Sequence, residues 1–469
     1  MLLDKNIAEL SDGLKKKLFT SVDLVNECYS NIKKYDLTIN SFITLVPLEE
    51  ALKNAKLADK NINDHSSLLH GIPFVLKDCF VTKNIKTTAA SNVLKNFNSP
   101  FNATVYQKLL SAGAILIGKM NMDAWGHGGS SENTDFGPVK NPWDIKRVAG
   151  GSGGGPAAAI ATRFAVFAIG EDTGGSIRNP SAWCNVTGLK VTYGRVSRYG
   201  SIAYASSFDT VGPTAKTSKD CAIILETIAG LDKYDATSSP QKVSNYSRLL
   251  NQKISGLTIG IPKEFFQDGL DPEIRQAVLS VAEKLKSLGV NTKEISMPMF
   301  DYGLPVYYII APSETSSNLS RYDGIRYGQN RDSFTQETMR RIMIGTYTLS
   351  AGYYDAYYKK AQEVRTLFIG EYKKALSECD VLLQPITPTP PPLFGELINN
   401  PLQNLLADVY TISQNTAGVP SLALPCGFTK NNLPIGAQIV GQMFSEDLLL
   451  RIGHQFQQIT DYHLQKPKL

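Results

Sequence analysis

Two glycine-rich segments present serine hydroxyls in a backbone that has little steric hindrance. The first reads Gly150-Gly151-Ser152-Gly153-Gly154-Gly155 and the second reads Thr173-Gly174-Gly175-Ser176. Glycine lets the backbone adopt unusual dihedrals and brings amide N–H groups close to a ligand. A serine in such a loop can act as a nucleophile, while nearby N–H groups stabilise the oxyanion of an acyl-transfer reaction. We therefore expect the active site to lie between residues 148 and 180.

Two interpretations of these loops meet difficulties. A phosphate-binding loop would need a lysine before its final hydroxyl residue, where this chain has Gly175. Glu171 and Asp172 would also repel phosphate. The phosphate-binding interpretation is therefore rejected. Residues 150–154 also satisfy the G-x-S-x-G pattern of the α/β-hydrolase nucleophile elbow. That elbow follows a strand, whereas residues 141–147 are predicted to be a loop. The only downstream histidines are His454 and His463, in a stretch that is predicted to be a helix and tail.

A serine hydrolase that works without histidine is the third interpretation. Ser176, after a predicted strand, would be the nucleophile, and Ser152 would relay protons. Lys77, at the end of a short apolar run, would be the base. Burial and neighbouring groups would have to lower the lysine pKa from about 10.4 toward neutrality. Ser–Lys pairs are a known variant of the Ser–His–Asp triad. The expected oxyanion hole consists of the N–H groups of Thr173, Gly174 and Gly175.

Alternating helices and strands must position these residues. Helices are expected up to about residue 60 and at 103–111 (capped by Asn102), 156–162 and 271–288 (capped by Asp271). Strands are expected at 72–76, 114–118, 164–169 and 257–261. This alternation predicts an α/β sheet with short connections. Residues 347–358 are predicted to form a helix with an aromatic face, and the proline-rich residues 385–392 a rigid loop.

Composition narrows the functional classes. The chain has 469 residues, 42% of them hydrophobic, and a net charge of +5 without a run of like charges, so it has no nucleic-acid-binding arm. Its six cysteines form no CxxC pair and its five histidines have no metal-ligand spacing, which predicts a reduced compartment and no metal site. No apolar run is long enough to span a bilayer, and the N-terminus lacks the pattern of a targeting peptide.

The two serine loops resemble the signature of the amidase signature family. The match covers residues 150–155, Ala157-Ala158-Ala159, and Asp172 through Arg178. The resemblance implies a Ser–cis-Ser–Lys triad with Ser176 as nucleophile, Ser152 after a cis peptide bond and Lys77 as base. It also implies a single α/β domain with a large mixed central β-sheet flanked by helices on both faces. We expect N-terminal helices over residues 1–60 and an amidase domain over 61–469, with its catalytic core at about 70–215.

Further segments resemble one branch of that family, the A subunits of glutamyl-tRNA(Gln) amidotransferases. They are residues 188–200, 205–209, 318–328 and 352–358. The resemblance implies a glutaminase that passes ammonia to a B-type subunit. That subunit is a kinase and transamidase that uses ATP and Mg, and the tRNA is contacted mainly through it. It also implies a small third subunit, and no cofactor on this chain. The resemblance implies that Tyr307, Arg341 and Asp408, within residues 300–430, hold glutamine. This assignment is chemically reasonable, since an arginine can bind the α-carboxylate and an aspartate the α-ammonium group.

Some positions depart from the family pattern. Gly153 replaces a second serine, Asn179 replaces glutamine, and the Trp125-Gly126-His127 run is unusual, so that His127 is expected to be a hydrogen-bonded loop histidine. A short segment between residues 328 and 341 and a pI near 8.6 favour a mitochondrial matrix protein over a bacterial cytoplasmic one. A stand-alone amidase and a non-catalytic scaffold protein remain alternatives.

Overall fold

A mixed sheet of eleven strands forms the centre of the computed structural model, which describes residues 1–326 and 328–469. Its strand order is β1-β3-β2-β6-β8-β7-β12-β13-β11-β9-β10. The strands are β1 (Phe42–Leu45), β2 (Pro73–Lys77), β3 (Ile115–Met120), β6 (Phe167–Asp172), β7 (Thr187–Lys190), β8 (Thr210–Ala215), β9 (Thr258–Pro262), β10 (Asn291–Ile295), β11 (Val381–Pro385), β12 (Ser421–Phe428) and β13 (Pro434–Val440). A separate two-stranded sheet pairs β4 (Lys140–Asn141) with β5 (Asp144–Val148).

Strand direction changes across the large sheet. Strands β3, β2 and β6 run parallel to one another, as do β11, β9 and β10. The strands between these two groups pair antiparallel. Strands β2 and β6 are buried along their whole length, as expected for parallel strands that are covered on both faces.

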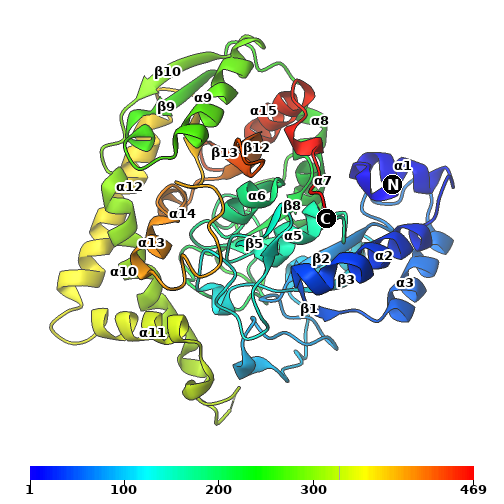
Figure 1. Cartoon of the computed structure of the whole chain (residues 1–469), viewed down its shortest axis with the longest axis horizontal. Helices are drawn as coiled ribbons and strands as arrows, with labels where there is room; N and C mark the ends of the chain where they lie inside the picture. The colour runs from blue at the N-terminus through cyan, green and yellow to red at the C-terminus, as the bar shows by residue number, and fades with distance from the viewer. Residues whose placement is uncertain (327) are drawn as a thin grey trace.

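Two short, fully buried helices lie over the middle of the sheet. Helix α5 (Gly154–Ala161) packs against β2, β6 and β8, and α6 (Arg178–Cys184) packs against β7, β12 and β13. Figure 1 shows both at the centre of the molecule. Helix α5 is almost uniformly apolar, which is typical of a helix buried on all sides. Each of the two serine loops leads directly into one of these helices.

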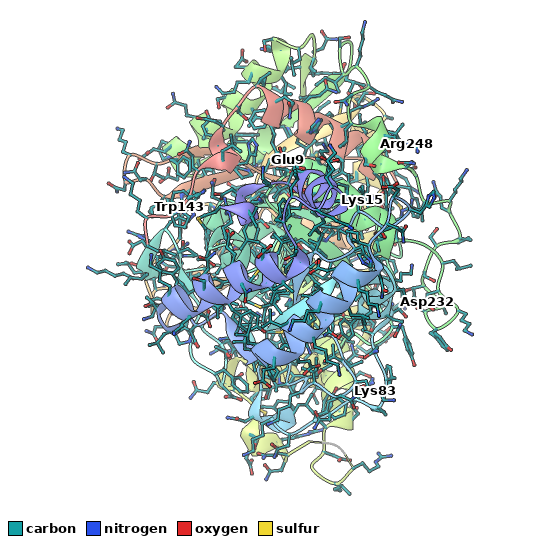
Figure 2. The ribbon with its side chains drawn as sticks, turned by 90° about the vertical axis from the view of Figure 1, so that its right-hand side faces the viewer. Glu9, Lys15, Lys83, Trp143, Asp232 and Arg248 are labelled. Carbon is teal, nitrogen blue, oxygen red and sulfur yellow. The ribbon has the colours of Figure 1, made fainter. Side chains whose placement is uncertain are left out.

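The remaining helices surround this centre. Helices α1 (Ile7–Lys15), α2 (Ser21–Ile39) and α3 (Leu48–Asn61) lie on one side, nearest the viewer in Figure 2, where Glu9 and Lys15 mark α1. Helices α10 to α13 lie on the opposite side in Figure 1. The termini are close together, since Lys466 Nζ is 2.5 Å from Asp4 Oδ2. The other helices are α4 (Thr104–Ser111), α7 (Ser218–Ile228), α8 (Tyr246–Leu249), α9 (Pro272–Lys286), α10 (Gly303–Asn318), α11 (Gln336–Thr348), α12 (Lys360–Ala375), α13 (Pro401–Leu406), α14 (Ile412–Ala417) and α15 (Glu446–Gln458).

The predicted α/β class, with one large mixed sheet in a single domain, is confirmed. Helix α9 begins after Asp271, whose carboxylate caps it as predicted.

Strand β1, between α2 and α3, was not predicted, and β6 begins three residues later than expected. The predicted Asn102 cap is wrong, because Asn102 Oδ1 accepts from Lys83 N. The predicted helix over 347–358 is also wrong: α11 ends at Thr348 and a π-helical turn follows at Asp355–Lys359.

Candidate active site

Parallel pairing of β2 and β6 brings a lysine and a glutamate together. Leu76 pairs with Ile169, so Lys77 and Glu171 both follow at the carboxyl ends of adjacent strands. Lys77 is fully buried, and its Nζ lies 2.9 Å from Glu171 Oε2 and 3.0 Å from the Glu171 carbonyl oxygen. The same Nζ donates to Ser152 Oγ at 2.8 Å. The expected base and the expected relay serine are therefore in direct contact.

Ser152 lies in the tight loop between β5 and α5. The Gly151–Ser152 peptide bond is cis. Close packing explains the glycines around it: a Cβ on Gly151 would lie 2.1 Å from Asp123 Oδ2, and one on Gly153 would lie 2.5 Å from the Ser176 carbonyl oxygen. The Gly153 N–H donates to that same carbonyl at 3.2 Å, which ties the two serine loops together. Within the described residues, no hydrogen bond joins the hydroxyls of Ser152 and Ser176.

The nucleophile loop connects β6 to α6, and Asp172 organises it. The Asp172 carboxylate accepts from Gly175 N at 2.9 Å and from Ile177 N at 3.0 Å, on either side of Ser176. The N–H of Gly175, one of the three predicted oxyanion donors, is therefore already bound to Asp172. In the described part of the chain, the N–H groups of Thr173, Gly174 and Ser176 make no such bond, so they are the donors left for a developing oxyanion.

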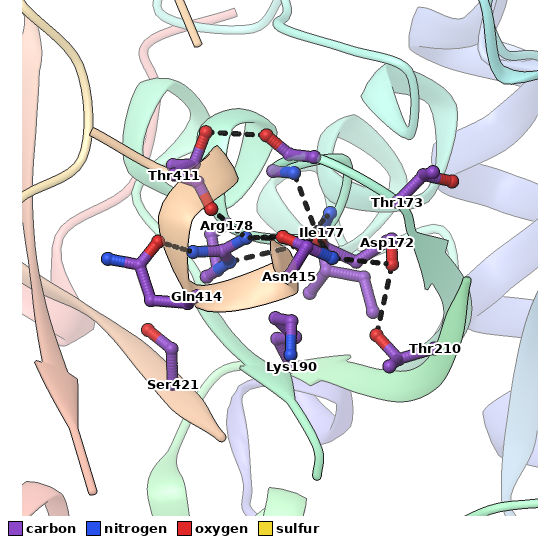
Figure 3. A network of polar contacts seen from close by, with 12 residues as sticks. Asp172, Thr173, Ile177, Arg178, Lys190, Thr210, Thr411, Gln414, Asn415 and Ser421 are labelled. Atoms are coloured by element: carbon purple, nitrogen blue, oxygen red, sulfur yellow. Dashed lines mark hydrogen bonds and ion pairs between the residues drawn. The ribbon is translucent and has the colours of Figure 1, made fainter. Parts of the chain in front are cut away.

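A buried ion pair anchors this loop to the C-terminal part of the chain. Arg178 Nε and Nη2 each donate to Asp172 at 3.1 Å, and both side chains are inaccessible to solvent. Figure 3 shows Arg178 between Asp172 and residues of α14 and the turn before it. Burial alone would raise the pKa of Asp172, but Arg178 outweighs this and holds it well below its usual range. The other partners of Arg178 are Thr411 O, Gln414 Oε1, Asn415 Oδ1 and Gln438 Oε1.

The protonation state expected for Lys77 is corrected by this geometry. We expected burial and neighbouring groups to lower its pKa toward neutrality. Burial does act in that direction, but the Glu171 carboxylate beside Nζ outweighs it and raises the pKa of Lys77 above its ordinary value. In the unliganded protein the amine is therefore an ammonium group, which donates its protons to Ser152 and Glu171.

Of the three residues expected to bind glutamine, Tyr307 lies next to the nucleophile loop, and Arg341 and Asp408 both contact its neighbour Tyr308. A Cβ on Gly174 would lie 2.5 Å from the Tyr307 hydroxyl, and one on Gly129 would lie 3.4 Å from Asp408 Oδ1. Arg341 is buried, with its Nε 2.9 Å from Glu337 Oε1, and Nη2 makes no hydrogen bond within the described residues. Burial raises the pKa of Asp408 to about 7, although the Tyr308 hydroxyl and Arg341 act in the opposite direction.

Tyr204, Tyr308 and His127 belong to the same cluster of side chains. The Tyr204 hydroxyl accepts from Arg341 Nη1, and Tyr308 donates to Asp408 Oδ2 at 2.7 Å. His127 packs edge-on against Tyr204, with ring centroids 4.6 Å apart. Its two ring nitrogens lie 3.2 and 3.0 Å from the hydroxyls of Thr338 and Thr315. Neither tyrosine was predicted, although Tyr308 directly follows Tyr307. His127 is buried and hydrogen-bonded, and burial followed by the Arg341 charge lowers its pKa well below normal.

The elbow interpretation does not fit this geometry. A strand, β5, does precede Ser152, contrary to the predicted loop, but it belongs to the small two-stranded sheet and not to the central one. Lysine rather than histidine contacts the Ser152 hydroxyl. In the described residues, no group of three or more His, Cys, Asp or Glu side chains is arranged to hold a metal ion. No helix described by the structure is long and apolar enough to cross a membrane.

Comparison with known proteins agrees with a serine amidase. The Amidase family model matches residues 23–450, and the chain belongs to the amidase signature family. It is 49% identical to the A subunit of glutamyl-tRNA(Gln) amidotransferase from Coxiella burnetii (strain Dugway 5J108-111), over 99% of both chains. It is 45% identical to the protein of the same name from Brevibacillus brevis, over 100% of this chain and 99% of that one. The crystal structure of the corresponding Thermotoga maritima protein superposes with a TM-score of 0.82 at 36% identity, covering 97% of this chain and 94% of that chain.

Proposed function

We propose that this chain is the glutamine-hydrolysing subunit of a glutamyl-tRNA(Gln) amidotransferase. The observation that carries the proposal is the cluster of side chains around Tyr307 and Tyr308, next to the Ser176 loop, which contains a buried cation, Arg341, and a buried carboxyl group, Asp408. An amino acid offers the complementary pair of charges on its α-carbon. Arg341 Nη2 can bind the α-carboxylate and Asp408 the α-ammonium group, which directs the side-chain amide toward the nucleophile loop.

Ser176 attacks the amide carbon in this mechanism. Its hydroxyl proton passes to Ser152, and Ser152 passes its own proton to Lys77, which contacts it at 2.8 Å and must give up one of its ammonium protons to accept it. The oxyanion is stabilised by the free N–H groups of the loop, and the loss of one such donor typically costs about 10²–10³ in rate. Ammonia leaves with a proton returned through Ser152, and water then hydrolyses the glutamyl ester of Ser176 by the same relay.

The proposal extends to an assembly. The names of the relatives support a role in a multi-subunit tRNA-dependent amidotransferase. Ammonia would pass to a B-type subunit that uses ATP and Mg and through which the tRNA is mainly contacted, with a small third subunit completing the complex. For the compartment, the bacterial relatives favour the bacterial cytoplasm over the mitochondrial matrix that the basic pI suggested.

Ammonia release from glutamine tests this function. We expect the purified chain to hydrolyse glutamine, and the rate to rise when the partner subunits, ATP and Glu-tRNA(Gln) are added. Ser176→Ala should abolish the activity. Ser181→Ala, which removes a buried hydroxyl one turn further along the chain, should retain it. Hydrolysis of simple amides that survives Arg341→Ala, without glutaminase activity, would instead identify a stand-alone amidase. Absence of all amide hydrolysis in the full complex would identify a scaffold protein.

A further inference from the structure

A second carboxyl group lies behind the Lys77–Glu171 pair. Thr173 Oγ1 is hydrogen-bonded to Glu171 Oε1 and lies 2.7 Å from Asp209 Oδ1. All three side chains are buried. Asp209 is held in place by the N–H groups of Tyr204 and Ala205, at 3.0 and 3.1 Å. The result is a continuous polar chain from Ser152 through Lys77, Glu171 and Thr173 to Asp209.

The number of protons shared by the Glu171 and Asp209 carboxyl groups follows from the Thr173 hydroxyl between them. A threonine hydroxyl has one proton, so it can donate to only one of two carboxyl oxygens. The second carboxyl must then donate to the threonine oxygen, which requires that it be protonated. Two carboxylates so close together in a buried site also cannot both ionise without a large electrostatic cost. The pair therefore carries one proton and one negative charge, and the negative charge faces the Lys77 ammonium.

Asp209 is the member that keeps this proton. Burial, reinforced by the Glu171 charge, raises the pKa of Asp209 well above its ordinary value. Glu171 instead has the Lys77 ammonium 2.9 Å from its carboxylate. Other charged or titratable groups that face the cluster include Cys79 after β2, Asp123 after β3, Asp172 on β6 and Arg198 in the loop before β8.

We propose that Glu171 is the proton partner of Lys77, and that the Thr173–Asp209 hydroxyl–carboxyl bridge holds Glu171 in place for this role. As the Ser176 oxygen bonds to the amide carbon, the Ser176 proton moves to Ser152 and the Ser152 proton moves to Lys77 Nζ. One Nζ proton moves to Glu171 Oε2, so that Lys77 ends the step as an ammonium group. The same three proton transfers run backwards when ammonia leaves. Glu171 touches no reacting atom and acts through Lys77, which makes it a positioning residue.

This inference rests on the proposed function only for the choice of amide. It resolves a difficulty of the mechanism, since an ammonium group cannot accept a proton unless it passes one on. Glu171 is the only carboxylate hydrogen-bonded to Lys77 Nζ among the described residues. Without Glu171, the buried amine would have to lose its proton to solvent before Ser152 could deprotonate Ser176.

The test is the pH dependence of Glu171→Gln, which keeps the shape but cannot accept the proton. We expect the ratio of variant to wild-type kcat, at saturating glutamine, to rise about tenfold per pH unit from pH 6 until Lys77 loses its proton. Glu171→Asp restores a carboxylate and should give a ratio that is low but independent of pH. Glu446→Gln alters a buried glutamate that accepts from Thr192 N, and serves as the matched control with a constant ratio.

A ratio for Glu171→Gln that is constant with pH would overturn the inference, because a purely structural defect lowers the rate equally at every pH. If the wild type releases no ammonia from glutamine but hydrolyses propionamide, the proposed function fails. The same ratio is then measured on propionamide, and its pH dependence still decides the role of Glu171.

Discussion

Replacing Asp172 by asparagine should destabilise the protein strongly while changing almost no volume. The Asp172 carboxylate accepts five hydrogen bonds: two from Arg178, two from the backbone around Ser176 and one from Asn415. An amide cannot neutralise the Arg178 charge, which is buried with no solvent access. Breaking a buried pair by removing one partner typically costs about 3–5 kcal/mol. We expect a loss of that size in the free energy of unfolding, measured by urea titration at pH 7.

Two controls separate this effect from a general loss of charge. Asp355→Asn removes a carboxylate that pairs with Lys359 in solvent, and it should leave stability nearly unchanged. The double variant Asp172→Asn, Arg178→Met removes both buried charges, so it should be destabilised by less than the sum of the single variants. A loss below about 1 kcal/mol for Asp172→Asn, or additive losses in the double variant, would refute the reasoning.

The pH dependence of this loss has a defined sign. The folded-state pKa of Asp172 lies below the unfolded value near 3.8. A carboxylate of this kind contributes stability above the unfolded pKa and loses it as the pH falls toward the folded pKa. The difference between wild type and Asp172→Asn should therefore be full from pH 5 upward and should shrink below about pH 4.

Three further outcomes concern the proposed glutamine-binding residues and His127. Arg341→Met should raise KM for glutamine by at least about tenfold through loss of a charged hydrogen bond of about 1.5–3 kcal/mol, and the rate on propionamide should be unchanged. Because the pKa of Asp408 is about 7, KM for glutamine should fall as the pH rises from 6 to 8, and Asp408→Asn should remove this dependence. His127→Phe should raise KM for glutamine by several-fold and leave the pH profile of kcat unchanged, since the histidine acts by packing Tyr204 against Arg341. A shifted pH profile would indicate that His127 transfers protons instead.

The sequence patterns predicted which residues form the candidate active site better than they predicted how these residues are arranged. Glycines around Ser152 and Ser176 marked both loops, because close backbone packing excludes any Cβ at Gly151 and Gly153. Helix α9 could be predicted with its cap, since Asp271 and Pro272 act locally. The Asn102 cap failed because the side chain accepts from Lys83, a contact that depends on tertiary structure.

The environment of Lys77 could not be predicted for the same reason. Glu171 is 94 residues away in sequence, and it reaches Lys77 only because β2 and β6 are parallel neighbours. Strand order is a property of the whole sheet, so no local pattern indicated that a carboxylate would raise the lysine pKa. The proposed glutamine-binding residues Arg341 and Asp408 were predicted from family resemblance alone, whereas the role of Tyr204 became visible only in the structure.

The anchoring of Arg178 has a consequence for synthesis of the protein on the ribosome. Gln414 lies 236 residues after Arg178 in the chain. At a translation rate of about 5–20 residues per second, about 12 to 47 seconds separate the synthesis of these two residues. Throughout that interval the nascent chain contains Ser176 but lacks the segment that fixes its loop, and closing so long a loop is slow. The hydrolase is therefore assembled only when its last strands have been made, and hydrolysis of glutamine reports that the whole chain has folded.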